Sequence, residues 1–405
     1  MIRSLLAVFL AAGLSAQTPS LLEQADEAFR QGDFERAGTL ARRVLARDPA
    51  AVHGHMILGV IAAQKNQWET SNRHFLTVVK YDPSNPYGYF YLGQAKLYQR
   101  QWEPAIQYFT KALERQYPDS NRLLVELALA QNEAGRPKEA LATLENASPP
   151  ADPRLAEQYH AVTAFALGKL NQFAPAIEAV RRALQIDDSS PHLWEFLIDT
   201  LIQTDEAPHA LAEAIRAQRK FPDSPDILFL FALASYRVAE SPLSPLALRN
   251  LREADPASPR VLLAEGLVHR KEGRNEQATA AFRQAAARGV PDAHLLLGIL
   301  LREAGDEAGA ELEYREAERV NSNNGQVLLE IGKMLVTRGD FTGALARLKR
   351  AAELMPSAAP VHYQLGIAYR RLEQNEDAKR HFQLYQQLQA QQRQQAASGT
   401  NPPRP

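Results

Sequence analysis

The sequence predicts an all-α solenoid of stacked antiparallel helix hairpins. A small residue and, twelve positions later, an alanine recur about every 34 residues, as in Gly93 with Ala105 and Gly332 with Ala344. A fixed period of this length is typical of a helical hairpin that is repeated along the chain. Capping residues occur in register with the period: several expected helix starts have an N-cap residue followed by proline. The chain is therefore expected to form one elongated array without a single core.

Each period is expected to contain a helix of about fourteen residues, a short turn and a second helix that runs back. Glycine or alanine in the first helix and alanine in the second let the two helices approach closely. A large side chain four residues after that alanine fills the space beyond, as Phe109 does after Ala105. The hairpins are expected to begin near residues 18, 52, 86, 121, 157, 191, 225, 259, 291, 325 and 359, and to fill residues 17–388.

The expected helix ends follow from short-range residue preferences. An N-cap oxygen followed by a first-turn proline occurs at Asn85-Pro86, Ser190-Pro191, Ser224-Pro225 and Ser258-Pro259. Chain reversals between the two helices of a hairpin favour glycine, which is found at residues 32, 135, 273, 305 and 339. The pattern departs from the rule at several places. Ile198 replaces a small residue, Ser71 and Ser244 replace an alanine, extra residues follow Ser148, and Pro242 and Pro245 lie near the turn of the seventh copy.

These residues resemble the tetratricopeptide repeat. The copy that begins at residue 86 matches the family pattern almost fully, with Tyr89, Gly93, Ala105, Phe109 and Ala112 in the expected places. The resemblance covers nearly the whole chain and implies a right-handed superhelix of about eleven repeats. It also implies a concave inner surface, formed by positions 2, 5, 9, 12 and 13 of each repeat.

Many of these inner positions carry apolar residues, which predicts a partner-binding strip because exposed apolar patches mark interaction sites. The candidate residues are Tyr87, Phe90, Gln94, Leu97, Tyr98, Val125, Leu129, Phe165, Phe229, Leu233, Tyr236, Leu263 and Leu267. The alternative is that superhelical winding or dimerisation already covers the strip, and the sequence does not decide between the two.

Basic residues at the inner positions of the C-terminal half, Arg270 and Arg302 among them, suggest a row of cations that could hold an acidic peptide end. The competing explanation is that cations are simply favoured near helix C-termini, and it is the stronger one.

No sequence motif of an enzyme, cofactor site or metal site is present. The chain has no cysteine, and its net charge of −1 does not suggest a nucleic-acid-binding face. His53 and His55 are close in sequence, but residues two apart point to different sides of a helix and cannot easily share a metal. The chain is therefore expected to have no catalytic residues and no cofactor.

Both ends are expected to lie outside the array. Residues 1–16 resemble a signal peptide, with Arg3 before an apolar run and a small-residue cleavage site at Leu14-Ser15-Ala16. This predicts export to the periplasm or the medium, without an integral membrane span. Residues 389–405 are rich in glutamine and proline and are expected to form a disordered tail.

The predicted function is that of a non-catalytic scaffold whose concave groove binds an extended peptide or a helix of another protein. The alternative is an accessory subunit of a cell-envelope machine for polysaccharide export or outer-membrane assembly, where aromatic residues could stack on a glycan. The oligomeric state does not follow from the sequence.

Overall fold

The computed structural model describes residues 20–148, 150–204, 206–238 and 244–397, and in this part of the chain it contains 22 helices and no strand. The chain divides into two compact units, Met1–Asp187 and Asp188–Pro405, which are considered separately below.

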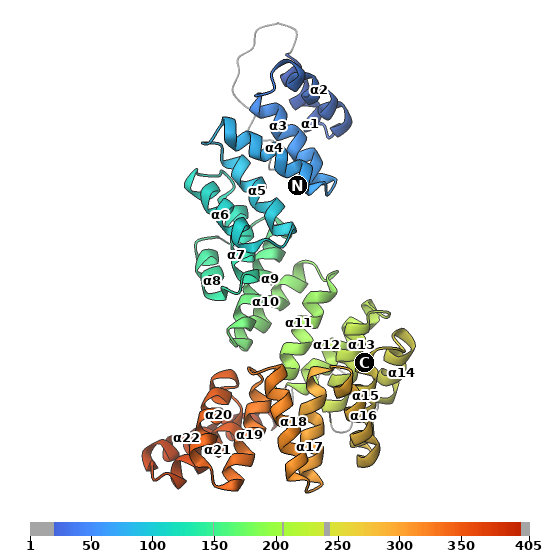
Figure 1. The fold of residues 1–405 in the computed structure, drawn as a ribbon, viewed down its shortest axis with the longest axis vertical. Coiled ribbons are helices and arrows are strands. Elements are labelled where there is room, and N and C mark those ends of the chain that lie inside the picture. Colours follow the sequence, from blue (N-terminus) through green and yellow to red (C-terminus); the bar gives the residue numbers. More distant parts are fainter. Residues whose placement is uncertain (1–19, 149, 205, 239–243, 398–405) are drawn as a thin grey trace. The chain divides into compact units, whose positions relative to one another are not determined.

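Unit 1 is a stack of five antiparallel helix hairpins (Figure 1). The hairpins are α1 (Leu21–Arg30) with α2 (Phe34–Arg47), α3 (Val52–Gln64) with α4 (Trp68–Tyr81), α5 (Pro86–Tyr98) with α6 (Trp102–Glu114), α7 (Ser120–Glu133) with α8 (Pro137–Glu145), and α9 (Pro153–Lys169) with α10 (Phe173–Ile186).

Unit 2 continues the pattern with six hairpins. They are α11 (Pro191–Gln203) with α12 (Ala207–Lys220), α13 (Pro225–Arg237) with α14 (Ser244–Ala254), α15 (Pro259–Lys271) with α16 (Asn275–Ala287), α17 (Pro291–Glu303) with α18 (Glu307–Val320), α19 (Gly325–Arg338) with α20 (Phe341–Leu354), and α21 (Ala359–Arg371) with α22 (Asn375–Ala397).

The predicted hairpin architecture is confirmed. Every first helix begins within four residues of its predicted start, and the largest shift is at α9. The irregularity expected after Ser148 is real: α8 has only 9 residues, α9 has 17, and α9 packs against α7 as well as against α8.

Within a hairpin, the closest approach is between the small residue of the first helix and the large side chain of the second. A Cβ atom added to Gly93 would lie 2.6 Å from the Phe109 ring, and one added to Gly266 would lie 2.4 Å from the Phe282 ring. Both rings are completely buried. The ring thus packs directly on the backbone of the small residue. In these two hairpins a side chain larger than that of glycine would collide with the ring.

In several hairpins the sizes of the two side chains in this contact vary in opposite directions, although Gly332 faces Leu348 and not an aromatic ring. Where the first helix has alanine in place of glycine, as at Ala128, the second helix has a smaller partner, Leu144, in the same buried cluster. The apparent exception in α11 follows the same rule, because the bulky Ile198 is in register with Ala214 of α12, and both are completely buried. The pair of positions is therefore filled to a similar volume in different ways.

The turns also follow the prediction. The five turn glycines named above have φ between 75° and 83°, in the left-handed region that glycine enters without steric cost. Arg100 and Glu373 occupy the equivalent turns at φ 57° and 62°, so the turn geometry persists where glycine is absent. Asn85 caps α5 as predicted, because its side-chain oxygen accepts a hydrogen bond from the Gly88 N–H at 3.2 Å.

The two ends are only partly described. The predicted signal peptide lies outside the described residues, and export stays a prediction. The last helix continues to Ala397, beyond the predicted start of the tail at residue 389, so the glutamine run extends α22. Residues 398–405 lie outside the described part. Within it, no helix combines the length and the apolar character that crossing a membrane requires.

We predict that Gly93→Ala lowers the free energy of unfolding by about 1–3 kcal/mol, because the added methyl group overpacks against Phe109. Phe109→Leu in the same chain should recover part of that loss, since it recreates the natural combination of Ala128 and Leu144. Urea-induced unfolding followed by circular dichroism measures both effects. A double variant that is destabilised by the sum of the two single losses would contradict the volume rule.

We further predict that Ser71→Ala is stabilising. Ser71 occupies the alanine position of α4, is 1% exposed, and its hydroxyl has no hydrogen-bond partner among the described residues. Since a buried unpaired hydroxyl costs about 1–3 kcal/mol, its removal should raise the free energy of unfolding by about 1 kcal/mol. A lower melting temperature for the variant would show that the hydroxyl has a stabilising partner.

Candidate partner-binding surface

The inner face of each first helix contains a row of residues at positions 2, 9 and 13 of the hairpin, which we call the inner stripe. In α5 these residues are Tyr87, Gln94 and Tyr98. Because they are separated by seven and four residues, they project from the same side of the helix. Tyr98 is 57% exposed, Tyr87 is half-buried, and Gln94 is buried.

The prediction that position 5 belongs to the exposed strip is wrong. Phe90 is completely buried; its ring stacks on Tyr117 at 4.3 Å and lies 5.8 Å from the Phe109 ring. Neighbouring hairpins approach so closely that this position packs between them. Val125 and Leu263 hold the same position and are also buried. The predicted site residues Leu97 at position 12, and Gln94 and Leu267 at position 9, are buried as well.

The remaining predicted apolar residues are half-buried rather than open. Leu129 and Phe165 lie in unit 1, where Leu129 packs against two buried clusters. In unit 2, Phe229, Leu233 and Tyr236 pack against the buried cluster that contains Leu263 and Leu267. A continuous apolar trough is therefore not present, and the accessible apolar surface is limited to separate places.

The most exposed aromatic contact of unit 1 joins two adjacent hairpins. The indole ring of Trp68, at the start of α4, stacks on the Tyr98 ring with centroids 4.3 Å apart and an interplanar angle of 14°. Neither ring is enclosed, since Trp68 is half-buried and Tyr98 is exposed. Trp68 was not among the residues predicted from the sequence, although it lies 34 residues before Trp102 and this spacing could have drawn attention to it.

Polar groups lie beside these rings. The Gln94 side-chain amide donates a hydrogen bond to the Glu126 carboxylate at 2.9 Å, across two adjacent first helices. The Arg122 guanidinium lies over the Phe90 ring at 5.2 Å. Burial raises the pKa of Glu126, while the hydrogen bond from Gln94 and the charge of Arg122 act in the opposite direction. Unit 1 therefore offers aromatic surface next to a fixed hydrogen-bonding pair.

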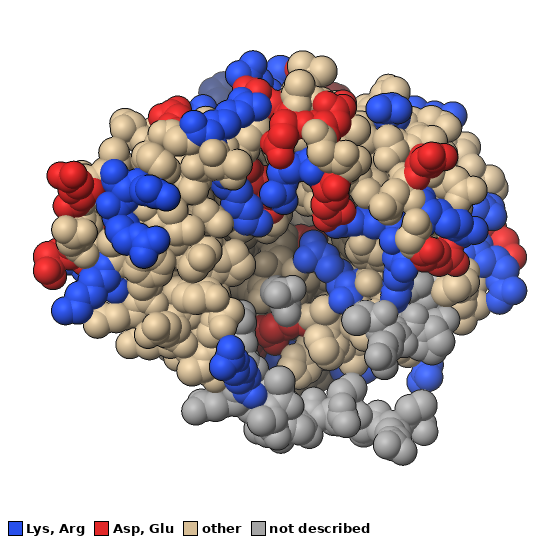
Figure 2. Space-filling view, turned by 90° about the horizontal axis from the view of Figure 1, so that it is seen from below, with Lys and Arg blue, Asp and Glu red and all other residues tan. Residues whose placement is uncertain are grey.

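Both predicted cations of unit 2 form ion pairs. Arg270 forms an ion pair with Glu303 at 2.7 Å, and Arg302 with the buried Glu330 at 3.0 Å. Both predicted cations are thus neutralised by acidic residues of the next hairpin. On the face shown in Figure 2, basic and acidic side chains are interspersed rather than separated by sign. Such pairs fix the stacking of hairpins more readily than they attract an acidic peptide.

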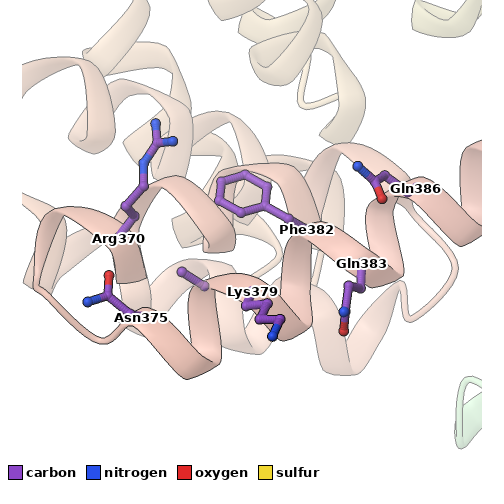
Figure 3. Close-up of a pocket in the computed structure, with 7 residues that line it drawn as sticks. Arg370, Asn375, Lys379, Phe382, Gln383 and Gln386 are labelled. Atoms are coloured by element: carbon purple, nitrogen blue, oxygen red, sulfur yellow. The ribbon is translucent and has the colours of Figure 1, made fainter.

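A shallow pocket of about 390 Å³ lies at the C-terminal end of the array (Figure 3). In the preceding hairpin the residues equivalent to Lys379 and Phe382 are Leu345 and Leu348, which are buried in a cluster with residues of α21. Here the groove is bordered by polar side chains, as expected for the terminal repeat of a solenoid. Its lining residues are Arg370, Asn375, Ala378, Lys379, Phe382, Gln383 and Gln386.

Comparison with known protein families gives matches along much of the chain. A tetratricopeptide repeat model matches residues 22–86, 90–156 and 263–324, and a TPR repeat model matches residues 332–372.

Three curated proteins are similar to parts of the chain. The TPR repeat-containing protein PA4299 of Pseudomonas aeruginosa is 33% identical over 136 residues, which cover 33% of this chain and 55% of that protein. Anaphase-promoting complex subunit 3 of Schizosaccharomyces pombe is 23% identical over 228 residues, which cover 55% of this chain and 34% of that protein. The human Protein IFIT1 homolog B is 33% identical over 101 residues, which cover 24% of this chain and 21% of that protein. The matches span from about a fifth to about half of the length of these relatives.

Two solved structures are similar over most of their length, at 13% identity. The APC/C hetero-tetramer Cut9–Hcn1 gives a TM-score of 0.47 and covers 96% of this chain and 88% of that one. Yeast Tom70 gives a TM-score of 0.39, and the similarity covers 91% of this chain and 84% of that one.

We predict that Glu126→Gln removes a pH-dependent loss of stability. Because the pKa of Glu126 is raised on folding, its stabilising contribution is complete below the unfolded-state pKa, about 4.3, and is lost as the pH rises through the folded-state pKa. The uncharged variant should therefore be more stable than the parent at pH 7 and similar to it at pH 4, as measured by urea unfolding. Glu114→Gln on α6, where the carboxylate is exposed, is the matched control for removing one acidic charge.

Proposed function

The chain belongs to the tetratricopeptide repeat family, and from this premise we propose that it is an exported, non-catalytic scaffold that binds a segment of another protein along the inner stripe of unit 1. The bound segment is an extended peptide or a helix, since both can lie along a row of parallel helices. The observation that carries the proposal is the exposure of Tyr98, a large aromatic residue that hairpin packing does not enclose.

The binding energy would come from a small number of aromatic and aliphatic contacts. Tyrosine and tryptophan provide a large contact area and lose few rotamers, which is why they are frequent anchors in protein interfaces. Tyr98 and Trp68 form the exposed end of the stripe, and the half-buried Tyr87 lies three helical turns away on α5. Between them, the half-buried Glu126, held by the side-chain amide of the buried Gln94, offers a carboxylate that can fix the register of a bound backbone.

A second candidate function rests on the same exposed ring. A tyrosine face that is open to solvent also suits stacking on a sugar, which is the contact expected of an accessory subunit of a cell-envelope machine for polysaccharide export or outer-membrane assembly. The two proposals differ in their ligand class, so a glycan array and a displayed peptide library, probed with the same chain, discriminate between them.

We predict that Trp68→Ala combined with Tyr98→Ala weakens binding of a library-selected peptide by about 10–100-fold, because interface anchors of this kind contribute about 1–3 kcal/mol. Far-UV circular dichroism should be unchanged, since neither ring is enclosed in a hairpin. Tyr81→Ala is the matched control: Tyr81 is 49% exposed on α4, outside the inner stripe.

Phe90→Ala serves as the contrasting variant. It should lower the free energy of unfolding by about 3–5 kcal/mol, because the ring belongs to the core between hairpins. Unchanged peptide affinity in the Trp68/Tyr98 double variant, or an equal loss in Tyr81→Ala, would contradict the proposed surface.

A further inference from the structure

The last hairpin, α21 with α22, leaves side chains uncovered at positions that the three preceding hairpins bury. In those three hairpins, the residues at positions 5, 24 and 27 lie in clusters that also contain residues of the first helix that follows. In the last hairpin the same positions hold Tyr363, Phe382 and Tyr385, of which Tyr363 is 41% exposed and the other two are half-buried. The buried residues at these positions in the three preceding hairpins are Leu263, Phe282 and Ala285, then Leu295, Tyr314 and Ala317, then Leu329, Leu348 and Ala351.

The three rings form one connected surface, which we call the end face together with Arg370 and Lys379. The Tyr363 ring lies 6.1 Å from the Phe382 ring and 5.1 Å from the Tyr385 ring, measured between centroids. Phe382 and the two cations also line the shallow pocket of Figure 3. An end that served only solubility would be polar at positions 5 and 27. Tyrosine at both positions instead combines a large apolar ring with a polar tip, which is typical of protein interfaces.

The repeat register shows what belongs opposite Arg370. This arginine is at position 12 of its hairpin, as are Arg270 and Arg302 in theirs. Each of those two pairs with a carboxylate of the following first helix, Arg270 with Glu303 at 2.7 Å and Arg302 with Glu330 at 3.0 Å. Arg370 forms no ion pair with any residue that the structure describes. A helix that covered the end face would therefore meet this cation with a carboxylate if it followed the register of the array.

The positive charge of the end face is not balanced locally. The Arg370 guanidinium lies over the Phe382 ring, 5.6 Å from its centroid. Lys379 is exposed and likewise has no ion pair within the described residues. The nearby carboxylate of Asp377 is already paired with Arg380 at 3.3 Å. Aromatic surface beside two cations is complementary to a ligand that is both apolar and acidic.

We propose that the end face binds an acidic amphipathic helix of a partner protein, which packs against α21 and α22 as the first helix of a following hairpin would. Its apolar side chains cover the three rings, and a carboxylate pairs with Arg370. The same surface of a second copy of this chain is a poorer ligand, because two copies placed end to end would bring both pairs of cations into one interface, where like charges repel.

A displayed library of helical peptides, selected against the full chain with Trp68→Ala and Tyr98→Ala, tests the proposal without a contribution from the inner stripe of unit 1. We expect the selected peptides to contain an acidic residue next to an apolar stripe. Fluorescence anisotropy then measures their affinities. Tyr363→Ala should weaken binding by about 10-fold, as expected for the loss of one interface anchor, with little change in melting temperature because the ring is exposed.

A charge reversal tests the predicted ion pair. Arg370→Glu should weaken binding by about 10-fold or more, because it places like charges opposite each other. A peptide whose acidic residue is replaced by lysine should regain affinity for this variant, an effect that a merely structural role of Arg370 would not produce. Arg371→Glu is the matched control, since Arg371 is exposed on the same helix but does not line the pocket.

Three results would overturn the proposal: no peptide is selected, the selected peptides bind the Arg370→Glu and Arg371→Glu variants equally well, or sedimentation velocity shows a dimer of the parent chain that Tyr363→Ala dissociates. The last result would make a second copy the occupant. Any of them would leave the proposed function of unit 1 intact, because the selection uses a chain without the Trp68 and Tyr98 rings and no residue is shared between the two surfaces.

Discussion

The contact between a small residue on the first helix and a large side chain on the second is the constraint on which the rest of this structure depends. It sets the distance between the two helices of a hairpin, and a Cβ atom at Gly93 or Gly266 would already collide with the opposing ring. Where the volumes at the two positions vary in opposite directions, as in Ala128 with Leu144 and Gly93 with Phe109, similar spacing is reached with different residues. Each hairpin then presents a comparable outline to the next one, and a regular stack follows from purely local packing.

Close stacking of the hairpins limits the surface available for binding, because it buries side chains that could otherwise contact a partner. Position 5 of the first helix is enclosed between hairpins, as Phe90 shows, and in α5 the residue of the inner stripe that stays exposed is Tyr98. The two units use this stripe differently. Unit 1 places Tyr87, Tyr98 and the adjoining Trp68 there, while the inner face of unit 2 carries ion pairs such as Arg302 with Glu330. Aromatic surface can supply affinity, whereas paired surface charges contribute little to it.

The architecture could be predicted because its signals are short-range and repeated. Glycine opposite a ring, an N-cap before proline and a glycine in the turn each act within one hairpin, so the sequence displays them at fixed spacing. The candidate site could be predicted only in part. The stacking of Trp68 on Tyr98 and the contact of His55 with His74 depend on how helices are rotated against each other, which residue spacing does not reveal. The same holds for Phe90, because its burial is determined by the approach of the following hairpin and not by its own helix.

The fixed spacing of the two helices also brings other side chains of a hairpin together. His55 contacts His74 and His362 contacts His381, at positions 4 and 23 of their hairpins, and neither position is part of the contact between small residue and ring. In different hairpins they hold two histidines or a histidine and a glutamate. In every case side chains from two helices meet at bonding distance without any dedicated loop. A contact of this kind depends on the fixed spacing of the two helices, and that spacing is set by the packing of glycine against its ring.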